Sequence, residues 1–248
     1  MQSELKWCNK LLDDLIDLKF DARGREYHGI YIIQCGVDCV LHIYFPNTSR
    51  VEGMYGLKTI HLDIDLLINS YTKVLFRLKG LMGKACRIYA RKTVVSRVDK
   101  KVAEEFLDEY HVNDSVVAKY RYGLYYNGEL VSLATFSGGR RMNEEKQDYR
   151  SFELVRFCNK GGYSVVGGIS KLIKKFVDDF HPNDIMTYCD RDWSEESSLS
   201  KIGFQIIGYV PEKTYMILSG KRCLYQNSNE KYDYLVKNRG SIKLKLYL

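Results

Sequence analysis

YGLYYNGELVSLATF, residues 122–136, is the stretch of sequence that decides the fold. Two runs rich in aromatic and β-branched residues, 120–126 and 129–137, flank the pair Asn127-Gly128. Both central residues of a type I′ turn need a positive φ, and Asn-Gly is the pair that adopts it most readily. The sequence therefore predicts an antiparallel β-hairpin at this point.

Strands and helices alternate on both sides of this hairpin. Upstream, β-branched residues predict a strand over 85–98, and apolar residues on one face predict a helix over 100–110. Downstream, a polar segment over 138–147 comes first. The elements then expected are a strand over 149–158, a helix over 169–180, a strand over 184–189, a short helix around 194–201 ended by Gly203, and strands over 204–209 and 214–218.

The first 84 residues have a different pattern. Apolar residues at three- and four-residue spacing predict a helix over 4–18. Strands are expected over 29–35, 37–45 and 59–65, followed by one helix over 66–81. The pattern predicts a small α/β unit over 1–84, a second domain over 85–218, and a basic, Tyr-rich extension over 219–248.

The composition is that of a globular protein. The chain has 248 residues with 38 Lys+Arg and 31 Asp+Glu, a net charge of +7, and the excess lies after residue 84. Such a surface can attract phosphate. No apolar stretch approaches the roughly 20 residues that cross a bilayer, and no signal peptide is evident, so we expect a cytoplasmic protein without a membrane partner. The oligomeric state is left open.

The cysteines form no CxxC pair. Their scatter argues against a disulfide framework and against a zinc site, so no metal is expected. We expect buried, reduced thiols at Cys8, Cys35, Cys39, Cys86, Cys158, Cys189 and Cys223.

The order of elements over 86–218 resembles the GNAT acyltransferase fold. The resemblance implies a mixed α/β (α+β) domain with a mostly antiparallel central sheet flanked by helices, and acyl-CoA as cofactor. In that family, backbone N–H groups before a helix hold the pyrophosphate, as helix N-termini do for anions. The positions that match are Val166, Gly167, Gly168, Ile169, Ser170 and Lys171.

This segment departs from the family pattern Arg/Gln-x-x-Gly-x-Gly/Ala. The two glycines are adjacent, and Lys160 is the upstream cation. A tight turn from strand to helix, with glycines at positive φ, explains the same residues without a ligand.

Several motifs resemble the C-terminal region of Hef-type phage hybrid homing endonucleases. They are IYARK (88–92), EEFLDEYH (104–111), YGLYYNGELVSLATF (122–136), FELVRFCNK (152–160), VVGGISKLIKKF (165–176), YCDRDWS (188–194) and KIGF (201–204). The resemblance implies a phage-type protein whose residues 60–84 follow a reduced nuclease remnant. That remnant lacks an E-x-K motif after Asp38. Mom-type DNA-modification proteins are a more distant resemblance, with Asp190 as the matching aspartate.

The candidate catalytic residues are Glu153, Asp190 and His111. Glu153 could act as general base if burial raises its pKa, although a structural ion pair explains it equally well. Strand alternation predicts Glu153 and Arg156 on opposite faces. Asp190 ends a strand at the edge where open α/β sheets collect ligands. His111 could transfer a proton or simply contact the helix dipole.

Candidate substrate-binding residues are Arg156, Arg191 and Trp193, and Trp193 could instead be a hydrophobic plug. The segment 194–202 offers Ser197, Ser198 and Ser200 but no tyrosine, the residue that the GNAT resemblance leads one to expect as general acid. Asp63 and Asp65 could hold a cation, but exposed carboxylates on an edge strand are the simpler interpretation.

Two classes of function follow. One is a phage-type acyltransferase that acts on a nucleobase or another amine, and Mom-type DNA base modification is a separate enzymatic alternative. The other is a non-catalytic DNA-binding module that holds phosphates on basic side chains. The basic residues expected at nucleic acid are Arg140, Arg141, Lys174 and Lys175.

Overall fold

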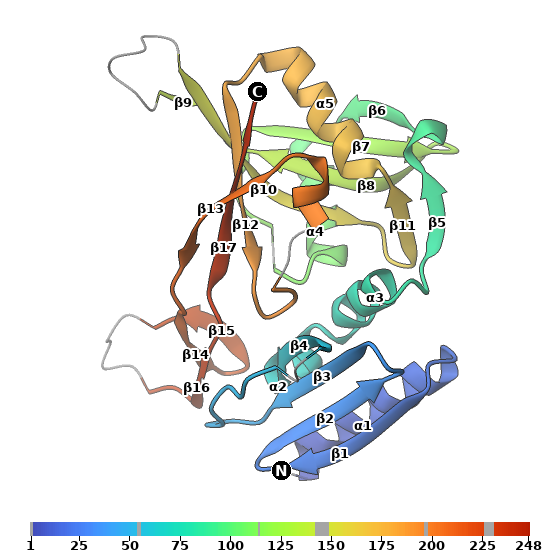
Figure 1. Ribbon diagram of the computed structural model, residues 1–248, viewed down its shortest axis with the longest axis vertical. Helices are drawn as coiled ribbons and strands as arrows, with labels where there is room; N and C mark the ends of the chain where they lie inside the picture. Colours follow the sequence, from blue (N-terminus) through green and yellow to red (C-terminus); the bar gives the residue numbers. More distant parts are fainter. Residues whose placement is uncertain (1, 54–55, 114, 142–148, 196–197, 226–230) are drawn as a thin grey trace. The chain divides into compact units, whose positions relative to one another are not determined.

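The computed structural model describes residues 2–53, 56–113, 115–141, 149–195, 198–225 and 231–248 (Figure 1). The chain forms two compact units, and both are discontinuous in sequence. Unit 1 comprises Met1–Tyr71, Cys189–Ser197 and Tyr209–Ile242, and unit 2 comprises Thr72–Tyr188, Ser198–Gly208 and Lys243–Leu248.

Unit 1 contains a four-stranded sheet in the order β1-β2-β3-β4. The pairs β1–β2 and β2–β3 are antiparallel and β3–β4 is parallel. Helix α1 buries Cys8, Leu11 and Leu15 completely. The elements are α1 (Gln2–Asp17), β1 (Ala22–Tyr27), β2 (Ile30–Cys35), β3 (Cys39–Tyr44), β4 (Lys58–Asp63) and α2 (Ile64–Asn69).

Three further strands of unit 1 come from the last forty residues. They pair antiparallel in the order β15-β14-β16. Their bounds are β14 (Thr214–Leu218), β15 (Lys221–Leu224) and β16 (Tyr234–Lys237).

Unit 2 is built on a larger sheet in the order β13-β17-β12-β10-β8-β7-β6, with β9 paired to β10. A separate parallel pair joins β11 to β5. The elements are α3 (Tyr71–Leu81), β5 (Cys86–Tyr89), η1 (Ala90–Lys92), β6 (Val94–Arg97), α4 (Lys100–Tyr110), β7 (Tyr120–Tyr126), β8 (Glu129–Phe136), β9 (Arg140–Arg141), β10 (Arg150–Asn159), β11 (Tyr163–Val166), α5 (Gly168–Phe180), β12 (Asp184–Asp190), η2 (Ser198–Ile202), β13 (Gln205–Val210) and β17 (Ser241–Tyr247).

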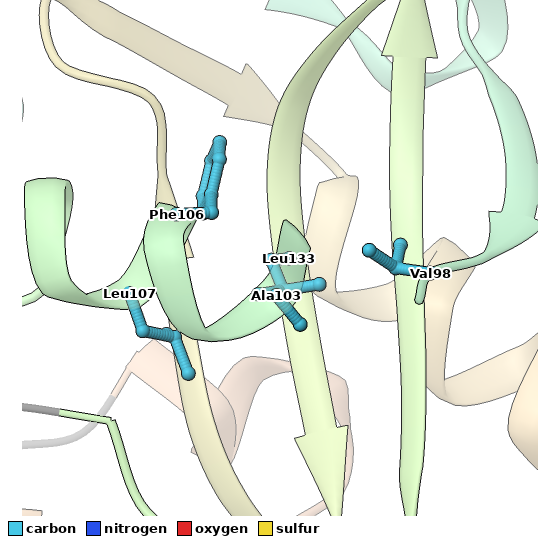
Figure 2. Close-up of a cluster of buried hydrophobic side chains, with 5 residues drawn as sticks. All are labelled: Val98, Ala103, Phe106, Leu107 and Leu133. Carbon is cyan, nitrogen blue, oxygen red and sulfur yellow. The ribbon is translucent and has the colours of Figure 1, made fainter. Parts of the chain in front are cut away.

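Helices cover both faces of this sheet. On one face, Phe176 of α5 stacks on Phe136 of β8 with ring centroids 3.9 Å apart. On the other face, α4 packs Ala103, Phe106 and Leu107 against Leu133 of β8 and Val98 (Figure 2). Residues that alternate along β8 therefore serve two different cores, as expected of a strand buried on both sides.

The expected fold class is confirmed: unit 2 has a mixed, mostly antiparallel sheet flanked by helices, and unit 1 contains a small α/β sheet at the N-terminus. The hairpin at Asn127-Gly128 is also confirmed, with φ of 49° and 81° at its two central residues. The helix predicted over 100–110 has the bounds observed for α4.

Some elements differ from the expectation. The single strand expected over 85–98 is divided into β5, η1 and β6. The single helix expected over 66–81 is interrupted at Ser70, whose ψ is 30° at the end of α2. The short helix expected around 194–201 is a 3₁₀ turn at Ser198–Ile202, and Ser197 and residues 142–147 lie outside the described residues.

Candidate active site

The parallel strands β10 and β12 pair over only three residues each. The register runs from Ser151 opposite Asp184 to Glu153 opposite Met186. Beyond it, the Thr187 hydroxyl donates to the carbonyl of Leu154 at 2.8 Å, while β10 continues to Asn159 along β8. In the described part of the chain, no further ladder pair joins β10 to β12. The sheet therefore has an open strand edge after Glu153.

A β-bulge lies at the same place. Leu154 pairs with Phe136 and Arg156 pairs with Thr135, so one extra residue, Val155, is inserted in β10. Directly paired residues share a face, and the faces of Phe136 and Thr135 are opposite. Arg156 is therefore on the same face as Glu153. The expectation that these two side chains point to opposite faces is wrong, because a bulge reverses the alternation.

This face of β10 also carries Cys158, which packs against the cluster under α4. His111 ends the same helix, and its Nδ1 lies 2.6 Å from the carbonyl oxygen of Asn113. Burial lowers the pKa of His111 to about 3, and the charges of Arg77 and Arg156 add to the effect. Three predicted site residues thus lie on one side of the sheet: Glu153, Arg156 and His111.

These residues differ in what they can do with a proton. His111 is neutral near pH 7 and, with its low pKa, a weak base. Glu153 is half-buried, its backbone N–H donates to Ser137 Oγ at 2.9 Å, and within the described residues its carboxylate has no hydrogen-bond or ionic partner. Glu153 is thus the better placed of the two to accept a proton from a bound molecule.

The glycine turn before α5 has a backbone suited to an anion. Gly167 is the N-cap at φ 75°, and no side chain caps the helix. The first N–H groups of a helix have no partner inside it, so those of Gly168, Ile169 and Ser170 are donors for an oxyanion. A Cβ at Gly168 would lie 3.1 Å from Val165 and 3.3 Å from Leu124. The turn itself therefore also requires glycine here.

Lys171 has a role of its own in this structure. Its ammonium donates to the carbonyl of Ala90 at 2.8 Å and also to that of Thr93. These bonds tie α5 to η1. The donors of the turn are consequently backbone groups rather than the Lys171 side chain, and Val166 precedes them with an exposed side chain.

Asp190, Arg191 and Trp193 belong to unit 1, whereas the other predicted site residues belong to unit 2. Asp190 stabilises the turn after β12, because its carboxylate accepts from the N–H of Asp192 at 2.9 Å and its carbonyl from that of Trp193 at 3.2 Å. Trp193 is 3% exposed. Its burial favours the hydrophobic plug over a contact with substrate.

A buried charge network in unit 1 was not foreseen from the sequence. Arg50 binds Asp63 at 2.5 and 3.0 Å and Asp192 at 3.1 Å. Arg222 binds Asp63 at 2.9 Å and Asp65 at 2.7 Å. Asp63 and Asp65 are each 3% exposed, so the expectation of exposed carboxylates is wrong. The guanidinium groups of Arg50 and Arg222 occupy the position at which a metal cation would contact these carboxylates.

Asp192 is the unusual member of this network. Burial raises its pKa to about 7 despite the opposing charge of Arg50, and the charges of Asp190 and Asp63 contribute. The nearby His61 has the opposite shift, since burial and the charge of Arg239 lower its pKa to about 3. Both shifts leave this interior with fewer charges near neutral pH.

The expected nucleic-acid residues are on the surface of unit 2. Arg140 and Arg141 are exposed on β9, and Lys174 and Lys175 are exposed on α5. Lys175 binds Asp179 at 2.7 Å, one helical turn away. Binding of DNA by these residues stays a prediction.

The cysteine expectation is only partly correct. No disulfide joins any of the seven described cysteines, and Cys8, Cys35 and Cys39 are buried as expected. Cys158 and Cys189 are only partly buried, and Cys86 and Cys223 are exposed. Among the residues that the structure describes, no three His, Cys, Asp or Glu side chains are grouped as metal ligands would be. Within the same residues, every helix is too short or too polar to traverse a lipid bilayer.

No protein-family model matches the chain, and no curated protein does so either. Among solved structures, a GNAT family acetyltransferase from Elizabethkingia anophelis with acetyl-CoA bound is 12% identical, with a TM-score of 0.37 over 63% of this chain and 99% of that one. An acetyltransferase from Bacillus subtilis in complex with CoA is 14% identical, with the same TM-score and coverage. The ribosomal-protein alanine N-acetyltransferase of Escherichia coli is 10% identical, with a TM-score of 0.40 over 62% of this chain and 93% of that one.

Proposed function

We propose that unit 2 is an acyltransferase of the GNAT type, which takes an acyl group from acyl-CoA and passes it to an amine. The observation that carries the proposal is the open strand edge of β10 after Glu153, where the pairing with β12 ends. Backbone N–H and C=O groups in the interior of a sheet rarely remain without a hydrogen-bond partner. The amide-containing arm of acyl-CoA is such a partner.

The turn before α5 supplies the phosphate site. The N–H groups of Gly168, Ile169 and Ser170 have no side-chain cap, and the helix dipole favours negative charge at this end. The positive φ of Gly167 allows the backbone to turn into the helix without a side chain in the way. Acyl-CoA brings a thioester, whose carbonyl carbon is open to attack by an amine.

Glu153 accepts the proton that the amine loses, directly or through a water. The new C–N bond forms as the C–S bond breaks, and the sulfur leaves with the electron pair. A thiol with a pKa of about 8.5 is a good leaving group as the thiolate, so a tyrosine near residues 194–202 is not essential. Arg156, on the same face as Glu153, supplies positive charge for the oxygen of the thioester as it becomes negative.

The acceptor we propose is an amine on a nucleobase, since Arg140, Arg141, Lys174 and Lys175 are exposed cations on the same unit. A DNA-binding module without catalysis is the second candidate, and the same four residues favour it. Phage origin, a relation to Hef-type endonucleases and Mom-type chemistry rest on the sequence resemblance alone.

The first experiment is a titration of the protein with acetyl-CoA by calorimetry, using Ser170→Asp as the test variant. The new carboxylate stabilises the start of α5 but repels phosphate, so affinity should fall about tenfold or more while the melting temperature is kept or rises. Lys174→Gln is the matched control, because it makes the same change in net charge on an exposed side of α5.

Absence of acetyl-CoA binding by the wild-type protein would contradict the proposal, as would equal affinities of wild type and Ser170→Asp. Release of free CoA thiol with an amine-bearing acceptor then tests catalysis, with Glu153→Gln as the variant. If only DNA binds, and salt abolishes the binding, the second candidate is the better account.

A further inference from the structure

A pocket of about 200 Å³ lies in unit 1, remote in sequence from the glycine turn and from β10. It is lined by Arg50, Val51, Glu52, Arg191, Glu212, Asn238 and Arg239. At roughly 30 Å³ for each water-sized group, it holds about seven such groups. That is room for a small molecule or for the head group of a larger one.

Arg191 and Arg239 are held in place by other residues, but some of their N–H groups have no acceptor among the described residues. Arg239 uses one terminal nitrogen, Nη1, for Glu195 and for His61 Nε2 at 3.1 Å. Arg191 uses Nε for Glu195 at 3.2 Å and Nη1 for the carbonyl of Arg239 at 3.2 Å. In the described chain, Nη2 of both residues and Nε of Arg239 donate to no protein group. Their side chains are only 21% and 30% exposed, so these donors are partly withdrawn from bulk water.

The amide of Asn238 adds another donor. Its Oδ1 accepts from the backbone N–H of Lys213 at 2.7 Å and of Gly240 at 3.1 Å. With the oxygen fixed by two N–H groups, the NH₂ of the same amide must point elsewhere. In the described residues it finds no acceptor. The pocket wall therefore has an excess of donors over acceptors.

Buried groups fix the position of the arginines. Arg cannot accept a hydrogen bond, so the contact with Arg239 makes His61 Nε2 the acceptor and places the His61 proton on Nδ1, which donates to Tyr44 Oη at 2.7 Å. Arg50 uses both terminal nitrogens on Asp63 and Asp192 and lies over the Tyr44 ring at 4.2 Å. Among the described residues its buried Nε has no hydrogen-bond partner.

Carboxylates outside the lining balance part of the arginine charge, since Asp63 and Asp192 pair with Arg50 and Glu195 pairs with both Arg191 and Arg239. Glu212 is paired with Lys237, which leaves Glu52 as the only lining carboxylate without a cation among the described residues. Three guanidinium groups meet at the pocket. Planar guanidinium groups with free N–H donors bind carboxylate and phosphate best.

We propose that this pocket binds the oxyanion head of a small metabolite, a carboxylate or a phosphate. The pocket shares no residue with the acyl-CoA site proposed above, and this proposal does not depend on that one. A phosphate would engage donors of Arg191, Arg239 and Asn238 together, and a carboxylate would engage one guanidinium in a bidentate pair.

The test is a titration of the ¹⁵N-labelled full-length protein with inorganic phosphate and, separately, with acetate, at constant ionic strength set by chloride. Saturable shifts of the amide signals of Val51 and Asn238 are expected with at least one of the two anions. Acetamide, the neutral analogue of acetate, should shift neither signal. The anion that saturates at the lower concentration identifies the head group.

Arg191→Gln should weaken the binding about tenfold, because a charge-assisted donor pair is lost. Arg191→Lys keeps the charge but loses the planar fork, so an intermediate affinity is expected and folding is less at risk. Arg23→Gln is the matched control in the same unit, since Arg23 is 85% exposed and lies outside the pocket.

Three results would overturn the proposal: no saturable shift with either anion, equal binding by wild type and both Arg191 variants, or equal loss in Arg23→Gln. The titrations contain no CoA. Failure of the acyl-CoA experiment and failure of this one are therefore independent results.

Discussion

The two units have different interiors. The core of unit 2 on the α5 side is aromatic: Phe176 contacts the rings of Phe136, Phe152 and Phe180. Unit 1 instead buries a network of ions, in which Asp63, Asp65 and Asp192 meet Arg50 and Arg222. Aromatic burial stabilises a fold without specifying polar geometry, whereas buried ions add little net stability and fix the position of each partner.

The two interiors therefore provide different groups for binding a ligand. In unit 1 the ion network fixes Arg50, and Glu195 holds Arg191 and Arg239, the other arginines that line the pocket. In unit 2 the core on the α5 side is aromatic, and the groups available to bind a ligand are backbone groups. They lie at the open edge of β10 and at the turn before α5. Three predictions test the contrast, beginning with the largest effect.

Phe176→Ala should destabilise the protein by about 3–5 kcal/mol, because it removes a completely buried ring from the centre of the aromatic cluster. Urea denaturation followed by far-UV circular dichroism measures the loss. Lys174→Ala, on an exposed side of the same helix, should change stability by less than about 0.5 kcal/mol. A small effect of Phe176→Ala would mean that the aromatic cluster is not the main source of stability in unit 2.

The ion network should make unit 1 sensitive to pH. The folded pKa of Asp192 is about 7, whereas an unfolded aspartate has a pKa of about 3.9. Between these two values the folded state holds the extra proton. The contribution of Asp192 therefore falls as pH rises from about 4 to about 7, by at most about 1.4 kcal/mol for each pH unit.

His61 acts in the opposite direction below its ordinary pKa of 6.5, because its folded pKa is about 3. The effect of Asp192 is therefore measured as the difference between wild type and Asp192→Asn, a variant that resembles the protonated acid. The advantage of Asp192→Asn should be greater at pH 8 than at pH 5. Both tryptophans, Trp7 and Trp193, belong to unit 1, so tryptophan fluorescence reports its unfolding. An advantage independent of pH would show that Asp192 is ionised throughout.

The sequence was most informative where local chemistry decides the structure. The Asn127-Gly128 turn and the α4 pattern needed no distant partner. Strand β1 was missed because ARGREY has almost no apolar residue and is exposed nearly throughout. Strand β17 was missed although Ile242 and Leu244 alternate with lysines and are fully buried, a period of two that could have been found.

The site was harder to predict. A bulge at Val155 changes which side chains share a face, and nothing local in ELVRF marks it. The ion network joins Asp63 to Arg222, residues 159 positions apart, so only the folded chain shows why Asp63 and Asp65 are buried. By contrast, the uncapped N–H groups before α5 follow from two adjacent glycines, and the sequence placed that turn correctly.

The smallest predicted effect concerns two turns of the same kind, one in each unit. Asn127-Gly128 links β7 to β8, and His28-Gly29 links β1 to β2 with nearly the same φ values, 45° and 80°. Asparagine tolerates positive φ better than histidine, which explains why only the first turn was recognised. His28 is exposed, and its ring meets Tyr27 edge-on at 4.4 Å, a contact that recovers part of the cost.

Exchanging these residues separates the backbone preference for positive φ from the contribution of side-chain contacts. His28→Asn should stabilise unit 1 by about 0.5 kcal/mol, the gain in backbone preference less the lost ring contact. Asn127→His should destabilise unit 2 by about 1 kcal/mol, because no matching contact is gained. Chemical denaturation of both variants measures the change in the free energy of unfolding. The double variant Tyr27→Ala/His28→Asn is the control for the lost ring contact. If His28→Asn is destabilising, the ring contact outweighs the backbone preference, and that turn is held by its side chains rather than by its φ values.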